Sequence, residues 1–395
     1  MVNVDTESFL TIVVVAALSA YLAGVLARRL VVPVVVLELV FGIVVGPEVL
    51  GLADPDDFIS FFANLGLGML FFFAGYEIDF ERIKGEPLKL ALAGWVVSLG
   101  LAYALGGLLA ALGVVLSLVF VGSAMATTAI GTLMPILRDA GELRTRFGTH
   151  LLAVGGIGEF GPILLITLVF STKSAAANAA ILLGFVALAV VAGVFAVRWV
   201  GRGWELFERT IEASSQLAIR FTVVVVFALV ALAASLGLEL LLGGFVAGII
   251  LRLALRGHDV EVLESKLTAI GYGFLIPFFF VVSGIKVDLG ALTDDPVELL
   301  KVPLFLVLFL AVRGAPAVVL YRRLLDVRDR MALAVFSATE LPLVVAITTI
   351  AVEEGHMRSA TAASLILAAI CSTAVFPVVG LRLRGDRASS AAALA

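Results

Sequence analysis

One carboxylate stands alone in a long apolar stretch of this chain. Glu159 is the only ionisable residue between His150 and Lys173. If the stretch crosses a membrane, an ionised carboxylate near its centre costs at least ~2.5–3.5 kcal/mol, so such a group is a candidate for function. The alternative is a buried ion-pair partner that only fixes helix register. Residues that would let a second helix approach surround it: Gly155, Gly156, Gly158, Gly161 and Pro162.

Polar residues also interrupt two other apolar stretches, residues 114–137 and 329–353. Small polar residues and a proline within such runs indicate broken helices. Carbonyls and hydroxyls that are exposed at a break can coordinate a dehydrated cation. Alternatively, the hydroxyls bond only to the backbone of their own helix. The residues concerned are Thr127, Thr128, Ser337, Glu340 and Pro342.

Arg313 is the remaining charged candidate, inside the apolar stretch 301–321. A guanidinium stays protonated at physiological pH. At membrane depth it therefore requires a carboxylate partner. We expect Glu159 or Glu340 to be that partner, and the sequence leaves the choice open. Glu340 can instead be a cation ligand, and pairing with Arg313 can be the same role as balancing the charge of the site.

The composition indicates that these stretches lie in a membrane. Of the 395 residues, 62% are hydrophobic and 15% are charged, with a mean hydropathy of +1.15. A soluble protein carries roughly 25% charged residues. Apolar runs of about 20 residues, long enough for a helix to span a bilayer, recur along the chain. They are continuous, which excludes the alternating strands of a membrane barrel. We predict an all-α polytopic membrane protein.

The apolar runs and the loop charges give a topology. Loops rich in Lys and Arg alternate with loops that are poor in base and often acidic, which predicts an N-terminus outside and a C-terminus in the cytoplasm. About 13 transmembrane helices are expected, near residues 8–27, 31–46, 59–78, 88–112, 114–137, 148–171, 177–198, 218–236, 238–255, 268–286, 301–321, 329–353 and 360–382.

The two halves of the chain resemble each other weakly. Phe71–Asp79 and Phe278–Asp288 share a pattern and lie seven spans apart, so equivalent helices cross the membrane in opposite directions. This is an inverted-topology repeat, a plan common among secondary transporters. We predict a first repeat over 1–200, an interfacial linker over 201–217, a second repeat over 218–382 and a disordered cytoplasmic tail over 383–395.

Several function classes find no support in the sequence. The three histidines and the single cysteine lack metal-ligand spacing, so no transition-metal site is expected. A formal net charge of −4 provides no basic surface for nucleic acid. No nucleophile–base set, metalloprotease motif or phosphate-binding glycine loop is present, so we expect neither an enzyme nor a cofactor.

With these residues in place, the chain resembles the monovalent cation:proton antiporter-2 family, which includes bacterial Na⁺/H⁺ and K⁺/H⁺ exchangers. The resemblance implies a homodimer in the plasma (inner) membrane. It also implies an elevator-like core domain with two crossing discontinuous helices, and a dimerisation domain. Segments in the family's order carry it: Pro33–Leu52, Phe71–Asp79, Ala126–Ile130, Arg146–Gly148, Gly243–Gly248, Phe278–Asp288 and the region of Glu340.

The resemblance extends to single positions, with two departures. The essential carboxylate of the family matches Glu159. Many members carry a polar residue immediately before it, where this chain has Gly158. Charge-moving members tend to carry Lys at the position of Arg313. The polar neighbour that many members have beside the essential carboxylate is therefore absent from this chain.

These observations lead to a hypothesis of competition at one carboxylate. Desolvation disfavours the ionised form of Glu159, whereas a bound Na⁺ or K⁺ favours it. Glu159 then carries either a proton or a metal cation. Arg313 cannot release a proton, so the exchange is expected to be electroneutral, one cation for one proton. A cation channel or an ion-coupled symporter on the same inverted-repeat scaffold is the alternative.

Overall fold

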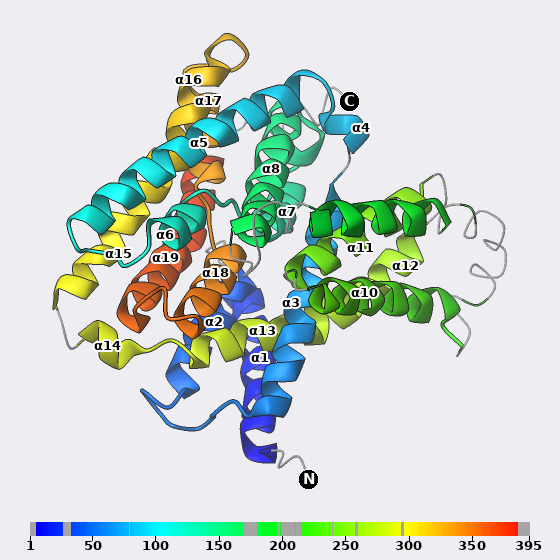
Figure 1. Cartoon of the computed structure of the whole chain (residues 1–395), viewed down its shortest axis with the longest axis horizontal. Helices are drawn as coiled ribbons and strands as arrows, with labels where there is room; N and C mark the ends of the chain where they lie inside the picture. Colours follow the sequence, from blue (N-terminus) through cyan, green and yellow to red (C-terminus); the bar gives the residue numbers. More distant parts are fainter. Residues whose placement is uncertain are drawn as a thin grey trace. The chain divides into compact units, whose positions relative to one another are not determined.

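A computed structural model gives the fold in Figure 1. It describes residues 5–26, 33–78, 80–169, 180–195, 198, 210, 215–236, 238, 240–256, 260–293 and 296–385. Within them the backbone forms helices and no β-strand. Nine of the described helices are long and apolar enough to cross a membrane, and shorter apolar helices accompany them. The prediction of an all-α polytopic membrane protein is confirmed, while the number 13 stays a prediction.

The chain divides into two compact units. One comprises Met1–Asp5, Pro55–Asp79 and Ile163–Val282, and the other comprises Thr6–Asp54, Phe80–Pro162 and Ser283–Ala395. The repeat halves expected over 1–200 and 218–382 stay predictions. Most of the expected linker 201–217 and residues 386–395 of the expected tail lie outside the described residues.

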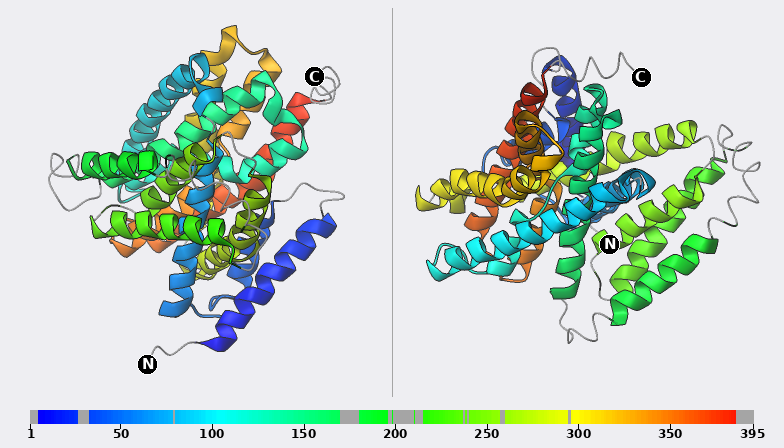
Figure 2. Two further views of the ribbon diagram at one scale, coloured as in Figure 1. Left: turned by 90° about the vertical axis from the view of Figure 1, so that its right-hand side faces the viewer. Right: turned by 90° about the horizontal axis from the view of Figure 1, so that it is seen from above.

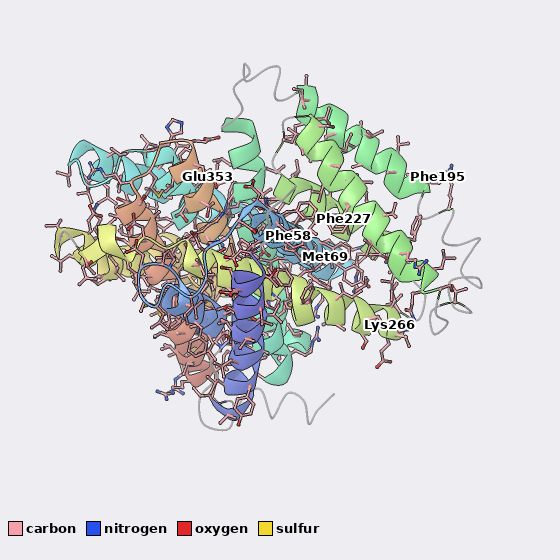
Figure 3. The ribbon with its side chains drawn as sticks, turned by 90° about the horizontal axis from the view of Figure 1, so that it is seen from below. Phe58, Met69, Phe195, Phe227, Lys266 and Glu353 are labelled. Atoms are coloured by element: carbon pink, nitrogen blue, oxygen red, sulfur yellow. The ribbon has the colours of Figure 1, made fainter. Side chains whose placement is uncertain are left out.

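Helix α3 (Asp57–Glu77) is the centre of the first unit. Glycines let its backbone approach α11 (Leu240–Ala254) closely: a methyl group on Gly244 would lie 2.5 Å from the carbonyl oxygen of Gly68. In Figure 3, Phe58 and Met69 mark α3, and Phe227 marks α10 (Leu217–Ser235). Helix α12 (Glu261–Ile270) joins α3 through Glu264, which accepts a hydrogen bond from the hydroxyl of Tyr76 at 2.7 Å.

The second unit contains every residue that the sequence singles out for function. It begins with α1 (Thr6–Leu26), one uninterrupted helix drawn in dark blue in Figure 2. Its other helices include α2 (Val34–Val45), α5 (Glu86–Ala111), α6 (Leu118–Met125), α7 (Ile130–Asp139), the first part of α8 (Arg146–Val169), α15 (Pro296–Phe309), α16 (Ala315–Leu320), α17 (Val327–Ser337), α18 (Pro342–Glu353) and α19 (Ser359–Arg384).

Two stretches of this unit leave the helical path where the sequence predicts a break. The first separates α6 from α7 over residues 126–129, and the second separates α17 from α18 over residues 338–341. Pro342 is the first residue of α18, a position that suits proline because the first N–H groups of a helix have no intrahelical partner. The proline ring also disfavours helical geometry at the preceding residue. The hydroxyl of Thr127 donates to the carbonyl of Ala124 at 3.0 Å, a bond that competes with helix continuation.

A buried cluster of charges fixes one end of the unit. The guanidinium of Arg384 donates to both carboxylate oxygens of Glu142, at 2.8 and 2.9 Å, and to Asp329 at 2.6 Å. Its Cζ atom lies 4.3 Å from the centre of the Phe147 ring. The cluster connects the end of α19 with the start of α17, the start of α8 and the turn Glu142–Arg144.

Candidate ion-binding site

The two helix breaks lie against each other. The N–H of Ala129 donates to the carbonyl of Thr339 at 2.8 Å, and the hydroxyl of Thr128 donates to the carbonyl of Ser337 at 2.5 Å. The N–H of Thr128 also donates to the carbonyl of Gly158 on α8, at 3.2 Å. Figure 1 shows the interruption between α6 and α7. Backbone groups released from helical bonding are therefore shared between three elements at one point.

Glu159 lies at this point and faces away from solvent. Its exposed fraction is 2%. A methyl group on Gly131, the second residue of α7, would lie 4.0 Å from Oε1 of Glu159, so the carboxyl group is directed toward the first break. This geometry places a buried carboxylate beside unwound backbone, and backbone carbonyl oxygens are of the kind that coordinate dehydrated cations.

The glycines of α8 each make room for a different neighbour. A methyl group on Gly155 would lie 2.6 Å from the side chain of Ile130, and one on Gly161 would lie 2.5 Å from the ring of Trp95. One on Gly158 would lie 2.8 Å from Oγ1 of Thr128. Gly156 and Pro162, the remaining members of the predicted set, are buried in the same continuous helix.

Arg313 is buried at the same place, but its partners differ from those expected. It belongs to the π-helical turn Leu310–Gly314, between α15 and α16. Its Nε and Nη2 atoms donate to the hydroxyl of Thr128 at 2.9 and 2.7 Å. Nη2 also donates to the carbonyl of Val154 at 3.2 Å, and Nη1 donates to the hydroxyl of Ser98 at 3.3 Å.

The expected ion pair of Arg313 is therefore not formed. Among the described residues, no carboxylate lies within ion-pair distance of it. Neutral acceptors satisfy its N–H groups instead. The charge of Glu340 acts on Arg313 at longer range.

Glu340 lies in the second break with its side chain fully buried. Its backbone N–H donates to the hydroxyl of Ser372 at 3.0 Å, and its carbonyl accepts from Thr373 at 3.1 Å. In the described part of the chain neither carboxylate oxygen has a well-formed hydrogen bond. The hydroxyl of Thr127 faces this carboxylate but donates to Ala124. Glu340 is therefore held in place through its backbone and not through its carboxylate.

The hydroxyl groups that the sequence analysis proposes as ligands donate hydrogen bonds mainly to backbone carbonyls. Ser337 donates from Oγ to the carbonyl of Arg313 at 3.1 Å or to that of Ala334 at 3.0 Å. Thr127 bonds back to the last turn of α6, a local backbone bond of the kind that the alternative interpretation expects. Thr128 is different, because it accepts from Arg313 and donates across to the second break.

The structure adds residues that the sequence analysis missed. Ser98 donates to the carbonyl of Val312 at 2.9 Å, and Trp95 donates to the carbonyl of Ala126, in the first break, at 3.2 Å. Ser372 and Thr373 hold the backbone of Glu340. A polar residue inside an apolar run was the only available signal for Ser98, Ser372 and Thr373.

A cavity of about 260 Å³ lies in the same unit at the end of α18 remote from Glu340. Glu353, which marks this end in Figure 3, is one of its lining residues. Thr348 also lines it, roughly 9 Å along the helix from Pro342. The wall is mainly apolar, and its polar lining residues carry both signs of charge: Ser283, Lys286, Asp288, Thr348, Thr349, Glu353 and Ser359.

Known proteins share this sequence pattern and this fold. YjbQ of Bacillus subtilis is 29% identical over 388 residues, which cover 92% of this chain and 61% of YjbQ. The Na⁺/H⁺-K⁺ antiporter GerN of Bacillus cereus is 29% identical over 291 residues, 70% of this chain and 71% of GerN. The chain thus spans less than two thirds of the length of YjbQ.

A solved structure matches the fold along nearly the whole chain. The sodium proton antiporter MjNhaP1 from Methanocaldococcus jannaschii, at pH 8, has a TM-score of 0.62 at 15% identity, covering 96% of this chain and 99% of that one. The family model described as "Sodium/hydrogen exchanger, transmembrane" matches residues 14–381. The chain therefore belongs to the sodium/hydrogen exchanger family of monovalent cation:proton antiporters.

Proposed function

We propose that this protein exchanges Na⁺ or K⁺ for H⁺ across the plasma (inner) membrane, with one cation moved for one proton. The exchange takes place at Glu159. The protonated carboxyl group carries H⁺ across and releases it, and the ionised carboxylate then binds a cation from the side to which the proton was released. Na⁺ and K⁺ are both proposed because GerN is named for both cations.

The observation that carries this proposal is the burial of Glu159 beside two interrupted helices. An ionised carboxylate without a counter-ion is costly in this setting, so the group is expected to hold one of two positive partners at all times. Carbonyls at the breaks and the Thr128 region supply oxygen atoms for a dehydrated cation. Thr127, Ser337 and Glu340 stay candidate ligands, reached by small movements of the breaks.

Arg313 and Glu340 supply a fixed charge background. Arg313 remains protonated throughout the cycle. The opposite charge of Glu340 acts on it without direct contact. If both stay ionised, their charges cancel, and the site is neutral with either H⁺ or a cation on Glu159. Electroneutral exchange follows from this balance.

The remaining features of the proposal concern assembly and movement. We propose a homodimer, an inverted repeat of residues 1–200 and 218–382, and elevator-type movement of the domain that carries the site. The N-terminus lies outside and the C-terminus in the cytoplasm. In this orientation the cavity lined by Lys286, Asp288 and Glu353 lies toward the outside.

The test is an exchange assay in proteoliposomes, with pH followed by a dye and each cation supplied in turn. We expect a gradient of Na⁺ or K⁺ to drive protons the opposite way at a rate that an imposed membrane potential leaves unchanged. Acceleration by the potential, at clamped ion concentrations, would contradict one-for-one exchange. Dissipation of a cation gradient without proton counterflow would instead indicate a channel, and movement of both in one direction a symporter.

A further inference from the structure

Gly158 leaves no room for a side chain. A methyl group there would overlap Nη2 of Arg313 and would lie 2.8 Å from Oγ1 and 2.9 Å from Cβ of Thr128. Both neighbours are buried and held by hydrogen bonds, so neither can move without breaking contacts in the site. The space that a side chain at Gly158 would need is therefore occupied by a guanidinium group.

Arg313 reaches this space through specific contacts with α8. Its Nη2 atom donates to the carbonyl of Val154, which lies one helical turn before Gly158. The same atom donates to Thr128, whose N–H donates to the carbonyl of Gly158. The guanidinium thus lies against the turn of α8 that precedes Glu159.

We infer that Gly158 is a positioning residue for the exchange and that Gly158 and Arg313 act as an interdependent pair. The missing side chain allows the permanent positive charge of Arg313 to lie against the turn that carries Glu159. There the charge replaces a second polar side chain next to the exchanging carboxylate. This inference rests on the proposed function, since it assigns how the pH range of exchange at Glu159 is set.

A positive charge near a carboxylate favours its ionised form. Moving Arg313 away should therefore strengthen proton binding at Glu159 and shift half-maximal exchange to more alkaline pH. Two titratable groups near Arg313, Glu340 and Tyr321, belong to the same unit. Neither residue is among the nearest neighbours of a methyl group on Gly158, which are Arg313 and Thr128.

The experiment is a double-mutant cycle of Gly158→Ala and Arg313→Lys in proteoliposomes, with exchange rate and pH profile as readouts. Lysine is shorter than arginine and vacates the position of Nη2. On the native background, we expect Gly158→Ala to lower exchange at least about tenfold and to shift half-maximal exchange by about half a pH unit or more toward alkaline values. On the Arg313→Lys background, we expect a loss of about threefold or less, due to the remaining contact with Thr128.

Gly155→Ala is the matched control, one turn earlier on the same helix. Its methyl group would meet the side chain of Ile130 and not Arg313. Its effect should therefore be the same on both backgrounds. Equal losses from Gly158→Ala on both backgrounds, with no shift of the pH profile, would overturn the inference.

Two further comparisons keep the test decisive. If Gly158→Ala alone does not fold, the Gly158→Ala, Arg313→Lys double variant should still fold and match Arg313→Lys within about threefold, and a larger loss would refute the pairing. Glu159→Gln separates this inference from the proposed function. Normal exchange by Glu159→Gln would refute the proposed function. If Glu159→Gln does not exchange, but the effects of the substitutions at Gly158 and Arg313 are independent, only the pairing of Gly158 with Arg313 is refuted.

Discussion

Two buried arginines in the same unit are satisfied in opposite ways. Arg384, 7% exposed, meets two carboxylates, with a bidentate contact to Glu142. Arg313, 3% exposed, meets two hydroxyls and a carbonyl. Opposite charges at short range make the first a cross-link between elements. The second keeps its hydrogen bonds without neutralising its charge, so that its field extends to groups nearby. The difference separates a charge that is neutralised by direct contact from a charge that is not.

The largest expected effect is on stability, at Arg384. Arg384→Gln leaves Glu142 buried without its partner, which costs about 3–5 kcal/mol when a buried pair is broken. We expect a marked fall of the melting temperature in detergent, and an unchanged pH profile of exchange in the fraction that remains folded. A shifted profile would mean that this cluster also takes part in exchange and would erase the contrast with Arg313.

The next largest effect is expected on the pH of half-maximal exchange, which substitutions of Arg313 and Glu340 should shift in opposite directions. Arg313→Gln removes a positive charge near Glu159 and should move half-maximal exchange about one unit toward alkaline pH. Glu340→Gln removes a negative charge and should move it toward acid pH. The measurement is exchange rate against pH for both variants. Shifts in the same direction would contradict the proposed balance of charges.

Thr128→Val offers a finer test of how Arg313 is held. Valine keeps the shape but removes the acceptor for two N–H groups of Arg313 and the donor to Ser337, and each unsatisfied buried group costs about 1–3 kcal/mol. We expect exchange to fall about tenfold. Thr128→Ser is the control, because it retains the hydroxyl and should stay within about threefold of the native rate. Equal losses in both variants would show that the hydroxyl alone does not hold Arg313 and would contradict this account.

The smallest effect is expected at an exposed cation. Lys84 forms an ion pair with Glu81, and the two side chains are 67% and 51% exposed. Solvent screens such pairs, so Lys84→Gln should change stability by less than about 1 kcal/mol. A melting temperature as low as that of Arg384→Gln would show that burial is not what makes the Arg384 cluster stabilising.

The sequence predicted the parts of the site that have a local signal. Glu159 stands alone in an apolar run, and Pro342 with its polar neighbours indicates a break. The ion pair expected for Arg313 was wrong for a physical reason. A buried cation requires acceptors, but backbone carbonyls such as that of Val154 are present at every position and carry no sequence signal. Their availability depends on tertiary contacts that composition and periodicity do not contain.

The Arg384 cluster is a second feature that the sequence did not predict. Glu142, Asp329 and Arg384 occupy three segments that are far apart in the sequence, and each segment carries other charged residues as well. Only the packing of α19 against the starts of α8 and α17 makes them one buried group. Long-range pairs of this kind become visible when the fold is known.

The most direct test of the central claim is a count of protons released when a cation binds. Purified protein in weakly buffered detergent is mixed with NaCl or KCl near the pH of half-maximal exchange, and the pH change is recorded. If Glu159 holds either H⁺ or a cation, the native protein should release up to about one proton per chain, and Glu159→Gln should release none. Undiminished release from Glu159→Gln, or none from a native protein that exchanges normally, would contradict competition at this carboxylate.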